Sequence, residues 1–242
     1  MFDELIYEYL DLRRAHRLVA AVSPLGGDRL VAGGPVEPRG DEPFPLAPGA
    51  GGVAELYRTP WVAEHFQCLH TEDGRYNINY VFPPLYTEEF LQRFVTNANA
   101  LQARLDQPLV MENIPGFFDV KASQLPEPVW LRRFFEGTGA GFLLDLPHIW
   151  LEAHYRAVKP AAWLAEFPLE RVVELHVAGV VEDNDLQGPW IAPAAPSDEM
   201  LDFMALAVSR CPRAQAVTFD AFSPSLTPEV LLSSVERIRQ SL

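Results

Sequence analysis

Residues 172–179 read VVELHVAG, an apolar and β-branched run with one imidazole, that of His176, near its C-terminal end. Short runs of this kind are typical of buried strands. Similar runs occur at four other places in the chain: WVAEHFQCL (61–69), PLVMENI (108–114), GFLLDL (141–146) and AVTFDAF (216–222). The runs predict a set of buried strands, in which the imidazole of His176 needs a polar partner or a ligand.

Amphipathic stretches with helical spacing separate these runs. They are TEEFLQRFVTNANALQARL (87–105), PVWLRRFFEGTG (128–139), KPAAWLAEFP (159–168), SDEMLDFMALAVSRC (197–211) and TPEVLLSSVERIRQSL (227–242). Thr87, Ser197 and Thr227 stand at the start of three of them and are expected to be N-caps. Strands that alternate with helices predict parallel βα units, and strands that are apolar almost throughout predict a sheet covered on both faces.

Two architectures fit this order, a TIM-barrel-like α/β fold and an open doubly wound sheet. The nucleotide-binding form of the open sheet lacks its motifs, since no GxGxxG follows a first strand and no P-loop is present. The positions of the polar residues, described next, favour the barrel. We therefore expect one TIM-barrel-like domain over residues 1–242, with a Gly/Pro-rich loop at 25–52.

The composition excludes several classes of partner. The formal net charge of -14 opposes binding to a phosphate backbone, so we expect no nucleic-acid partner. The N-terminal residues lack the basic start and apolar core of a signal peptide, and no apolar run reaches the length of a membrane span. We therefore expect a cytoplasmic protein that does not enter a membrane.

Carboxylates and imidazoles stand at or near the C-terminal ends of the predicted strands. They are Glu112, Asp145 with His148, His176 and Asp220. From position 112 the intervals are 33, 31 and 44 residues, close to one βα repeat each, the last with an insertion. The C-terminal strand ends of a TIM barrel meet at one mouth, so these side chains are expected to lie close together.

Such a cluster needs a compensating charge, because crowded and buried carboxylates repel one another. A divalent cation removes that penalty, and mixed His and Asp/Glu ligands suit iron, manganese or zinc. Structural readings stay open for single members: His176 as a hydrogen-bonded core residue, Asp145 as a helix N-cap and Asp220 as the cap of a turn. His65 and His70 are weaker candidates, near the end of an early strand.

Six short motifs, in order, resemble a known family. They are WVAEHF (61–66), FPPLYTEEFL (82–91), PLVMENIPGFF (108–118), GFLLDLPHIW (141–150), ELHVAG (174–179) and TFDAFSP (218–224). The resemblance is to the multinuclear non-haem iron enzymes typified by the methanobactin biosynthesis iron enzyme, which have a xylose-isomerase-like TIM barrel. It implies two or three irons, oxidation of a peptide cysteine by dioxygen, and a small partner protein that recognises the peptide.

The resemblance carries over to single residues. His65 matches the histidine of the first motif, and Glu112 matches a glutamate that bridges metals in the family. Asp145 and His176 match a ligand aspartate and a ligand histidine, while His148 stands where the family usually has asparagine.

Other positions depart from the family. Ala192 and Ala194 stand where it has an aspartate and a histidine, and Thr218 replaces a ligand glutamate, although Asp220 remains. The early family histidine has no match, and because the N-terminal part is short we expect the first barrel strands to be missing or remodelled. Because alanine cannot bind a metal, we expect one or two irons rather than three, with manganese or zinc as other candidates.

The predicted function is that of an iron-dependent oxidoreductase that modifies a cysteine-containing peptide with the help of a small partner protein. The predicted metal ligands are Glu112, Asp145, His176, His148 and His65, with Asp220 and His70 as weaker candidates. Two alternatives stay open. One is a catalytically lapsed barrel that serves as a protein-interaction subunit, and the other is a sugar-isomerase-like or hydrolytic metalloenzyme.

Overall fold

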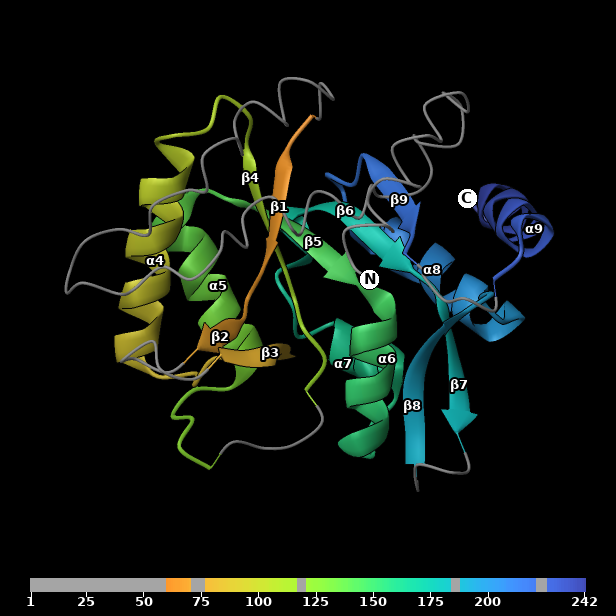
Figure 1. The fold of residues 1–242 in the computed structure, drawn as a ribbon, viewed down its shortest axis with the longest axis horizontal. Helices are drawn as coiled ribbons and strands as arrows, with labels where there is room; N and C mark the ends of the chain where they lie inside the picture. The colour runs from red at the N-terminus through yellow and green to blue at the C-terminus, as the bar shows by residue number, and fades with distance from the viewer. Residues whose placement is uncertain (1–59, 71–76, 117–120, 184–187, 221–225) are drawn as a thin grey trace.

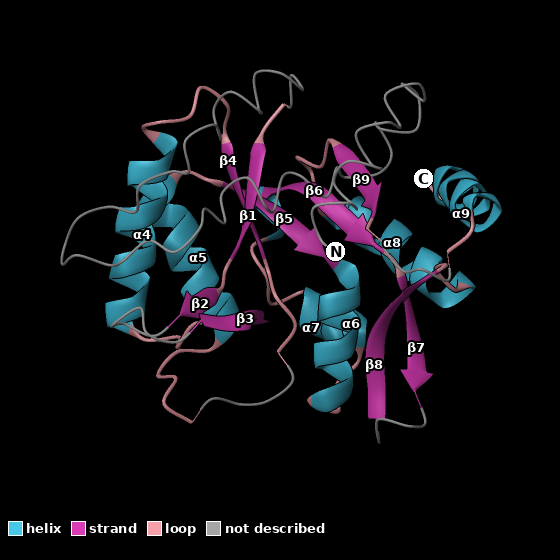
Figure 2. Ribbon diagram, viewed as in Figure 1, coloured by secondary structure: helices cyan, strands magenta, loops and turns pink. Residues whose placement is uncertain are grey.

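A five-stranded sheet forms the centre of the molecule (Figures 1 and 2). The structure is a computed structural model and describes residues 60–70, 77–116, 121–183, 188–220 and 226–242. In spatial order the strands are β1 (Val62–His65), β4 (Leu109–Glu112), β5 (Gly141–Asp145), β6 (Val172–Val177) and β9 (Ala216–Phe219). Each neighbouring pair is parallel, so the predicted parallel βα order is confirmed.

Helices follow the sheet strands along the chain. They are α4 (Glu88–Gln102), α5 (Glu127–Thr138), α6 (Leu146–Tyr155), α7 (Pro160–Leu164), α8 (Asp198–Arg210) and α9 (Pro228–Gln240), with a 3-10 turn η2 (Leu169–Arg171). The predicted N-caps are confirmed, since the hydroxyls of Thr87, Ser197 and Thr227 each accept a hydrogen bond from the third backbone N–H that follows. Gly139 ends α5 at φ 71°, a left-handed conformation that favours glycine.

The two faces of the sheet differ in chemistry because successive side chains of a strand point to opposite sides. On one side Leu144, Leu175 and Phe219 join the large apolar cluster that includes buried residues of the helices. On the other side Val110 and Leu143 belong to a small separate cluster. The residues two positions further along these two strands are carboxylates, so the small apolar cluster gives way to polar groups toward the C-terminal strand ends.

Two antiparallel hairpins form separate two-stranded sheets, β2 (Cys68–His70) with β3 (Asn77–Phe82) and β7 (Gly179–Asp183) with β8 (Gly188–Ala194). The second hairpin is the insertion expected from the long interval between His176 and Asp220. Gly179 opens it where the chain passes close to itself, since a Cβ there would lie 2.3 Å from the carbonyl oxygen of Ala195.

The predicted run 61–69 is not one strand. The chain leaves β1 after His65, where the backbone N–H of Phe66 donates to the Glu112 carbonyl at 2.9 Å and that of Gln67 turns back to the His65 carbonyl. This break ends β1 beside the last residue of β4 and starts the β2–β3 hairpin.

Some predictions concern residues that lie outside the described part of the chain. The predicted Gly/Pro-rich loop at 25–52 and the predicted loss or remodelling of the first barrel strands concern residues outside those described, and the single domain over 1–242 stays a prediction. Among the described helices, none combines the length and the apolar character that crossing a membrane requires.

Candidate metal centre

Four of the predicted site residues meet at the C-terminal ends of the sheet strands. Glu112 ends β4, Asp145 ends β5, His176 lies in β6 and Asp220 directly follows β9. Each offers one ligand atom, and these four atoms all lie within 4.8 Å of one another. The parallel register brings them together, since Asp145 pairs with His176 across neighbouring strands.

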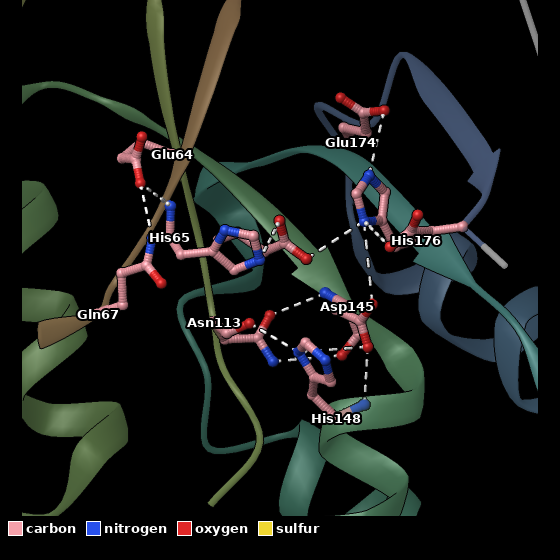
Figure 3. A network of polar contacts seen from close by, with 10 residues as sticks. Glu64, His65, Gln67, Asn113, Asp145, His148, Glu174 and His176 are labelled. Carbon is pink, nitrogen blue, oxygen red and sulfur yellow. Dashed lines mark hydrogen bonds and ion pairs between the residues drawn. The ribbon is translucent and has the colours of Figure 1, made fainter. Parts of the chain in front are cut away.

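The imidazole of His176 lies at the centre of this group, and Figure 3 shows the carboxylate of Asp145 on the side of its Nδ1. Its Nδ1 lies 3.2 Å from Glu112 Oε1, 3.4 Å from Asp220 Oδ2 and 3.9 Å from Asp145 Oδ2. Glu112, Asp145 and His176 are each 3% exposed or less, while Asp220 is half-buried. The group is therefore open to solvent chiefly on the Asp220 side.

The pKa values of these groups show the electrostatic cost of the cluster. Burial raises the pKa of Asp145 to about 7; His176 opposes this rise and Asp220 adds to it. Burial would lower the pKa of His176, but the carboxylates of Glu112 and Asp220 outweigh it and hold that pKa well above the ordinary value. The pKa of Asp220 is lowered, because the contact with His176 outweighs the effect of burial. Three carboxylates thus depend on one imidazole for compensating charge.

A divalent cation fits this donor set. Within the described part of the chain, neither ring nitrogen of His176 has a partner in hydrogen-bond geometry, although both are buried. Buried polar atoms in native proteins are normally satisfied, and a cation bound to the imidazole would satisfy it among these carboxylates. A mixed nitrogen and oxygen donor set suits iron, manganese or zinc.

The raised pKa of Asp145 predicts a pH dependence of stability in the metal-free protein. The usual pKa is 3.8 and the folded value about 7, so between these values the folded chain keeps a proton that the unfolded chain has released. The ionisation of Asp145 therefore lowers the free energy of unfolding as the pH rises through this window, by up to about 4 kcal/mol. We expect the Asp145→Asn variant to gain stability relative to the wild type between pH 4 and 7 in urea titrations, and a constant difference would contradict this.

Two further imidazoles border the cluster. His65 Nε2 lies 3.3 Å from Glu112 Oε2, the carboxylate oxygen that does not face His176. His148 Nδ1 lies 2.8 Å from the carbonyl oxygen of Asn113, and because a carbonyl can only accept, Nδ1 carries the proton and Nε2 keeps its lone pair. Burial lowers the pKa of both rings, so both are neutral and able to bind a metal.

Asp145 is also the N-cap of α6, as the structural reading proposed. Its Oδ1 accepts from the backbone N–H of His148 at 2.7 Å, while Oδ2 faces His176. The side chain of Asn113 holds this strand end from the other side: its amide donates to the Asp145 carbonyl at 3.2 Å, and its carbonyl accepts from the Asp145 N–H at 2.8 Å. One carboxylate thus joins the helix start to the cluster.

Glu174 is a site residue that the sequence analysis missed. It lies on β6 two residues before His176, so both side chains share a face of the sheet, and it is 6% exposed. Its carboxylate accepts from the Trp61 indole and from the Thr218 hydroxyl, each at 2.6 Å. The alternation of a strand could have indicated it, since Glu174 and His176 are two residues apart.

The remaining candidate positions are not among the four residues that converge. His70 belongs to β2, and its side chain is outside the described residues. Ala192 and Ala194 lie in β8, where Ala194 pairs with Gly179. Thr218 faces the same side of the sheet as Glu174, and its hydroxyl donates a hydrogen bond to the Glu174 carboxylate.

The parallel sheet is similar in fold to the xylose-isomerase-like TIM barrels. A xylose isomerase domain-containing protein from Salmonella typhimurium aligns with a TM-score of 0.50 over 80% of this chain and 66% of that one, at 20% identity. A likeness at this identity concerns the fold, and it confirms the TIM-barrel-like prediction.

The particular family follows from the sequence. The family model described as RiPP precursor modification enzyme MbnB/TglH/ChrH matches residues 50–240, and the chain belongs to this family. The predicted resemblance to the methanobactin-type enzymes is therefore confirmed.

Two relatives give the extent of the similarity. A UPF0276 protein from Rhizobium meliloti is 33% identical over 136 residues, which are 56% of this chain and 43% of the relative. A UPF0276 protein from Bordetella pertussis is 31% identical over 157 residues, 64% of this chain and 54% of the relative. The chain thus spans about half the length of the curated relatives it matches.

Proposed function

We propose that the protein is a cytoplasmic, metal-dependent enzyme, with iron as the first candidate, that oxidises a cysteine-containing peptide. The observation that carries this proposal is the convergence of Glu112, Asp145, His176 and Asp220 within 4.8 Å in a chain of a peptide-modifying family. The cluster is buried and no residue in the described part of the chain hydrogen-bonds its central imidazole, which is the situation that a bound cation resolves.

Each residue has a role in this proposal. One ion would be held by Glu112, Asp145, His176 and Asp220. A second ion would lie at a neighbouring position, held by His65 together with Glu112, and His148 would complete that position. A bound iron supplies Lewis acidity and one-electron chemistry toward a thiolate and dioxygen. Asn113 keeps the end of β5 in place through its two hydrogen bonds to Asp145.

The family description supports a proposal for the substrate class. The family description names precursor peptides, so we propose a peptide whose cysteine is oxidised while dioxygen accepts the electrons. A small partner protein would recognise the peptide. The described cysteines of the chain are free and burial raises the pKa of both, to about 11 for Cys68 and about 12 for Cys211, so neither is suited to act as a thiolate nucleophile.

A second candidate is a catalytically lapsed barrel that acts as an interaction subunit. One observation favours it: Thr218 stands where the family has a ligand glutamate, and its hydroxyl is directed to Glu174 instead. The reduced ligand set predicts weaker or less extensive metal binding than in a complete centre. A hydrolytic or isomerase-like use of the same carboxylates is the third alternative.

Metal analysis of protein expressed with supplementary iron separates these functions. We expect about one bound iron per chain, or two if the His65 position is filled, and a loss of most of it in the Glu112→Ala variant, because Glu112 faces both positions. Oxygen consumption with a cysteine peptide and partner would support the oxidative enzyme. Bound iron without oxygen consumption would favour a hydrolase or isomerase, and substoichiometric metal unchanged by the substitution would support the lapsed barrel.

A further inference from the structure

We infer that Glu174 is a positioning residue that directs Nδ1 of His176, rather than Nε2, to the metal; this inference rests on the proposed metal centre. The two ring nitrogens face different groups. Nδ1 faces Glu112, Asp145 and Asp220, whereas Nε2 lies 3.6 Å from Glu174 Oε1 (Figure 3). The ring is thus placed between a ligand cluster on one side and a single carboxylate on the other.

Glu174 is held by two donors from distant parts of the chain. Trp61, next to β1, donates its indole N–H to Oε2 at 2.6 Å, and Thr218 in β9 donates its hydroxyl to Oε1 at 2.6 Å. Glu174 and Thr218 are buried, so the contact between them forms away from bulk water, while the contact with the half-buried Trp61 is partly buried. Two short charge-assisted hydrogen bonds fix the orientation of the carboxylate before any metal binds.

The chemistry of imidazole then assigns the proton. A neutral imidazole carries one N–H, so a ring that binds a cation through Nδ1 must carry its proton on Nε2. That N–H is buried and needs an acceptor, and Glu174 Oε1 is the carboxylate oxygen that faces it. The present 3.6 Å is longer than a hydrogen bond, so we expect the two atoms to approach by about 0.4 Å or more when the ion binds.

Thr218 gains a role from this arrangement. It cannot replace the glutamate that the resemblance places at this position, but its hydroxyl holds the carboxylate that orients His176. Metal-bound histidines commonly donate their other ring N–H to a carboxylate, and loss of such a partner typically weakens metal binding by about 10- to 100-fold.

The Glu174→Gln variant tests this role while keeping the size of the side chain. The glutamine amide has one acceptor oxygen where the carboxylate has two. In one orientation its NH2 group faces the N–H of the Trp61 indole, and in the other it faces the His176 ring, so one of these donors loses its acceptor. The matched control is Glu152→Gln, because Glu152 is also buried and also accepts from an indole, that of Trp163 at 2.9 Å. Thr218→Val removes only one donor to Glu174 and covers the case in which Glu174→Gln does not fold.

The measurement is Co²⁺ binding by competition with a chelator, together with the visible absorption spectrum of the Co²⁺ protein. We expect about 10- to 100-fold weaker binding and an altered spectrum for Glu174→Gln, a smaller loss for Thr218→Val, and no change for Glu152→Gln. Wild-type affinity and spectrum in both site variants, even with reduced thermal stability, would overturn the inference alone. Absence of Co²⁺, Zn²⁺ and Fe²⁺ binding by the wild type would overturn the metal centre itself.

Discussion

The His176→Ala variant is expected to lose metal affinity by more than the roughly 10- to 100-fold that outer residues of a metal site contribute. His176 is the only nitrogen donor among the four residues that converge, and its Nδ1 lies within 3.9 Å of all three carboxylates. Without it the carboxylates keep their mutual repulsion and lose the ligand that selects a transition metal over calcium. Competition titrations with a chelator under anaerobic conditions measure the affinity for Fe²⁺.

His154→Ala is the matched control for this prediction. His154 belongs to the last turn of α6, is exposed, and its ring contacts Tyr155 with 5.6 Å between the ring centroids. We expect the control to bind Fe²⁺ as the wild type does. Equal affinities of the His176→Ala variant and the control would show that the imidazole of His176 is structural.

The second large effect is expected from Trp130→Ala, which should lower the free energy of unfolding by about 3–5 kcal/mol. Trp130 is fully buried in α5, and its ring packs against Phe66, Phe94 and Phe134 at centroid distances of 5.4–6.0 Å. Its indole also donates to the carbonyl of Thr87, the N-cap of α4. The substitution leaves a cavity where α4, α5 and the end of β1 meet, and it removes the indole hydrogen bond to the Thr87 carbonyl, which keeps its bond from the Leu91 backbone N–H.

Urea denaturation followed by circular dichroism measures this loss. Val129→Ala is the control, because Val129 precedes Trp130 in the same helix but is 44% exposed. We expect a change within about 0.5 kcal/mol for the control. A loss below about 1 kcal/mol for Trp130→Ala would contradict the packing described for this cluster.

Much of the fold and the main cluster could be predicted from periodicity. The apolar runs and the capped amphipathic stretches predict the parallel βα order, because strands and helices have different repeats. Glu112, Asp145, His176 and Asp220 were identifiable because each stands near a strand end about one βα unit from the next. The C-terminal ends of parallel strands meet, so spacing along the chain becomes proximity in space.

The contacts that support the cluster could not be predicted in the same way. Trp61 and Glu174 are separated by 113 residues, and their contact depends on how β1 and β6 are placed in the sheet. The pairing register between β5 and β6 shifts between Phe142 and Leu143, and the residue pattern does not predict this irregularity. Asp145 is a third case. From the sequence, a helix N-cap and a metal ligand were alternative roles for this residue. In the structure one carboxylate oxygen caps α6 and the other faces His176.

The most direct test of the central claim is anomalous X-ray diffraction at the iron edge from crystals of iron-loaded protein. We predict an anomalous peak about 2.0–2.3 Å from Nδ1 of His176 and from oxygens of Glu112, Asp145 and Asp220. A second peak beside His65 and Glu112 would indicate the dinuclear form. No peak at His176 in crystals whose protein contains stoichiometric iron, or a peak at other residues, would contradict the account.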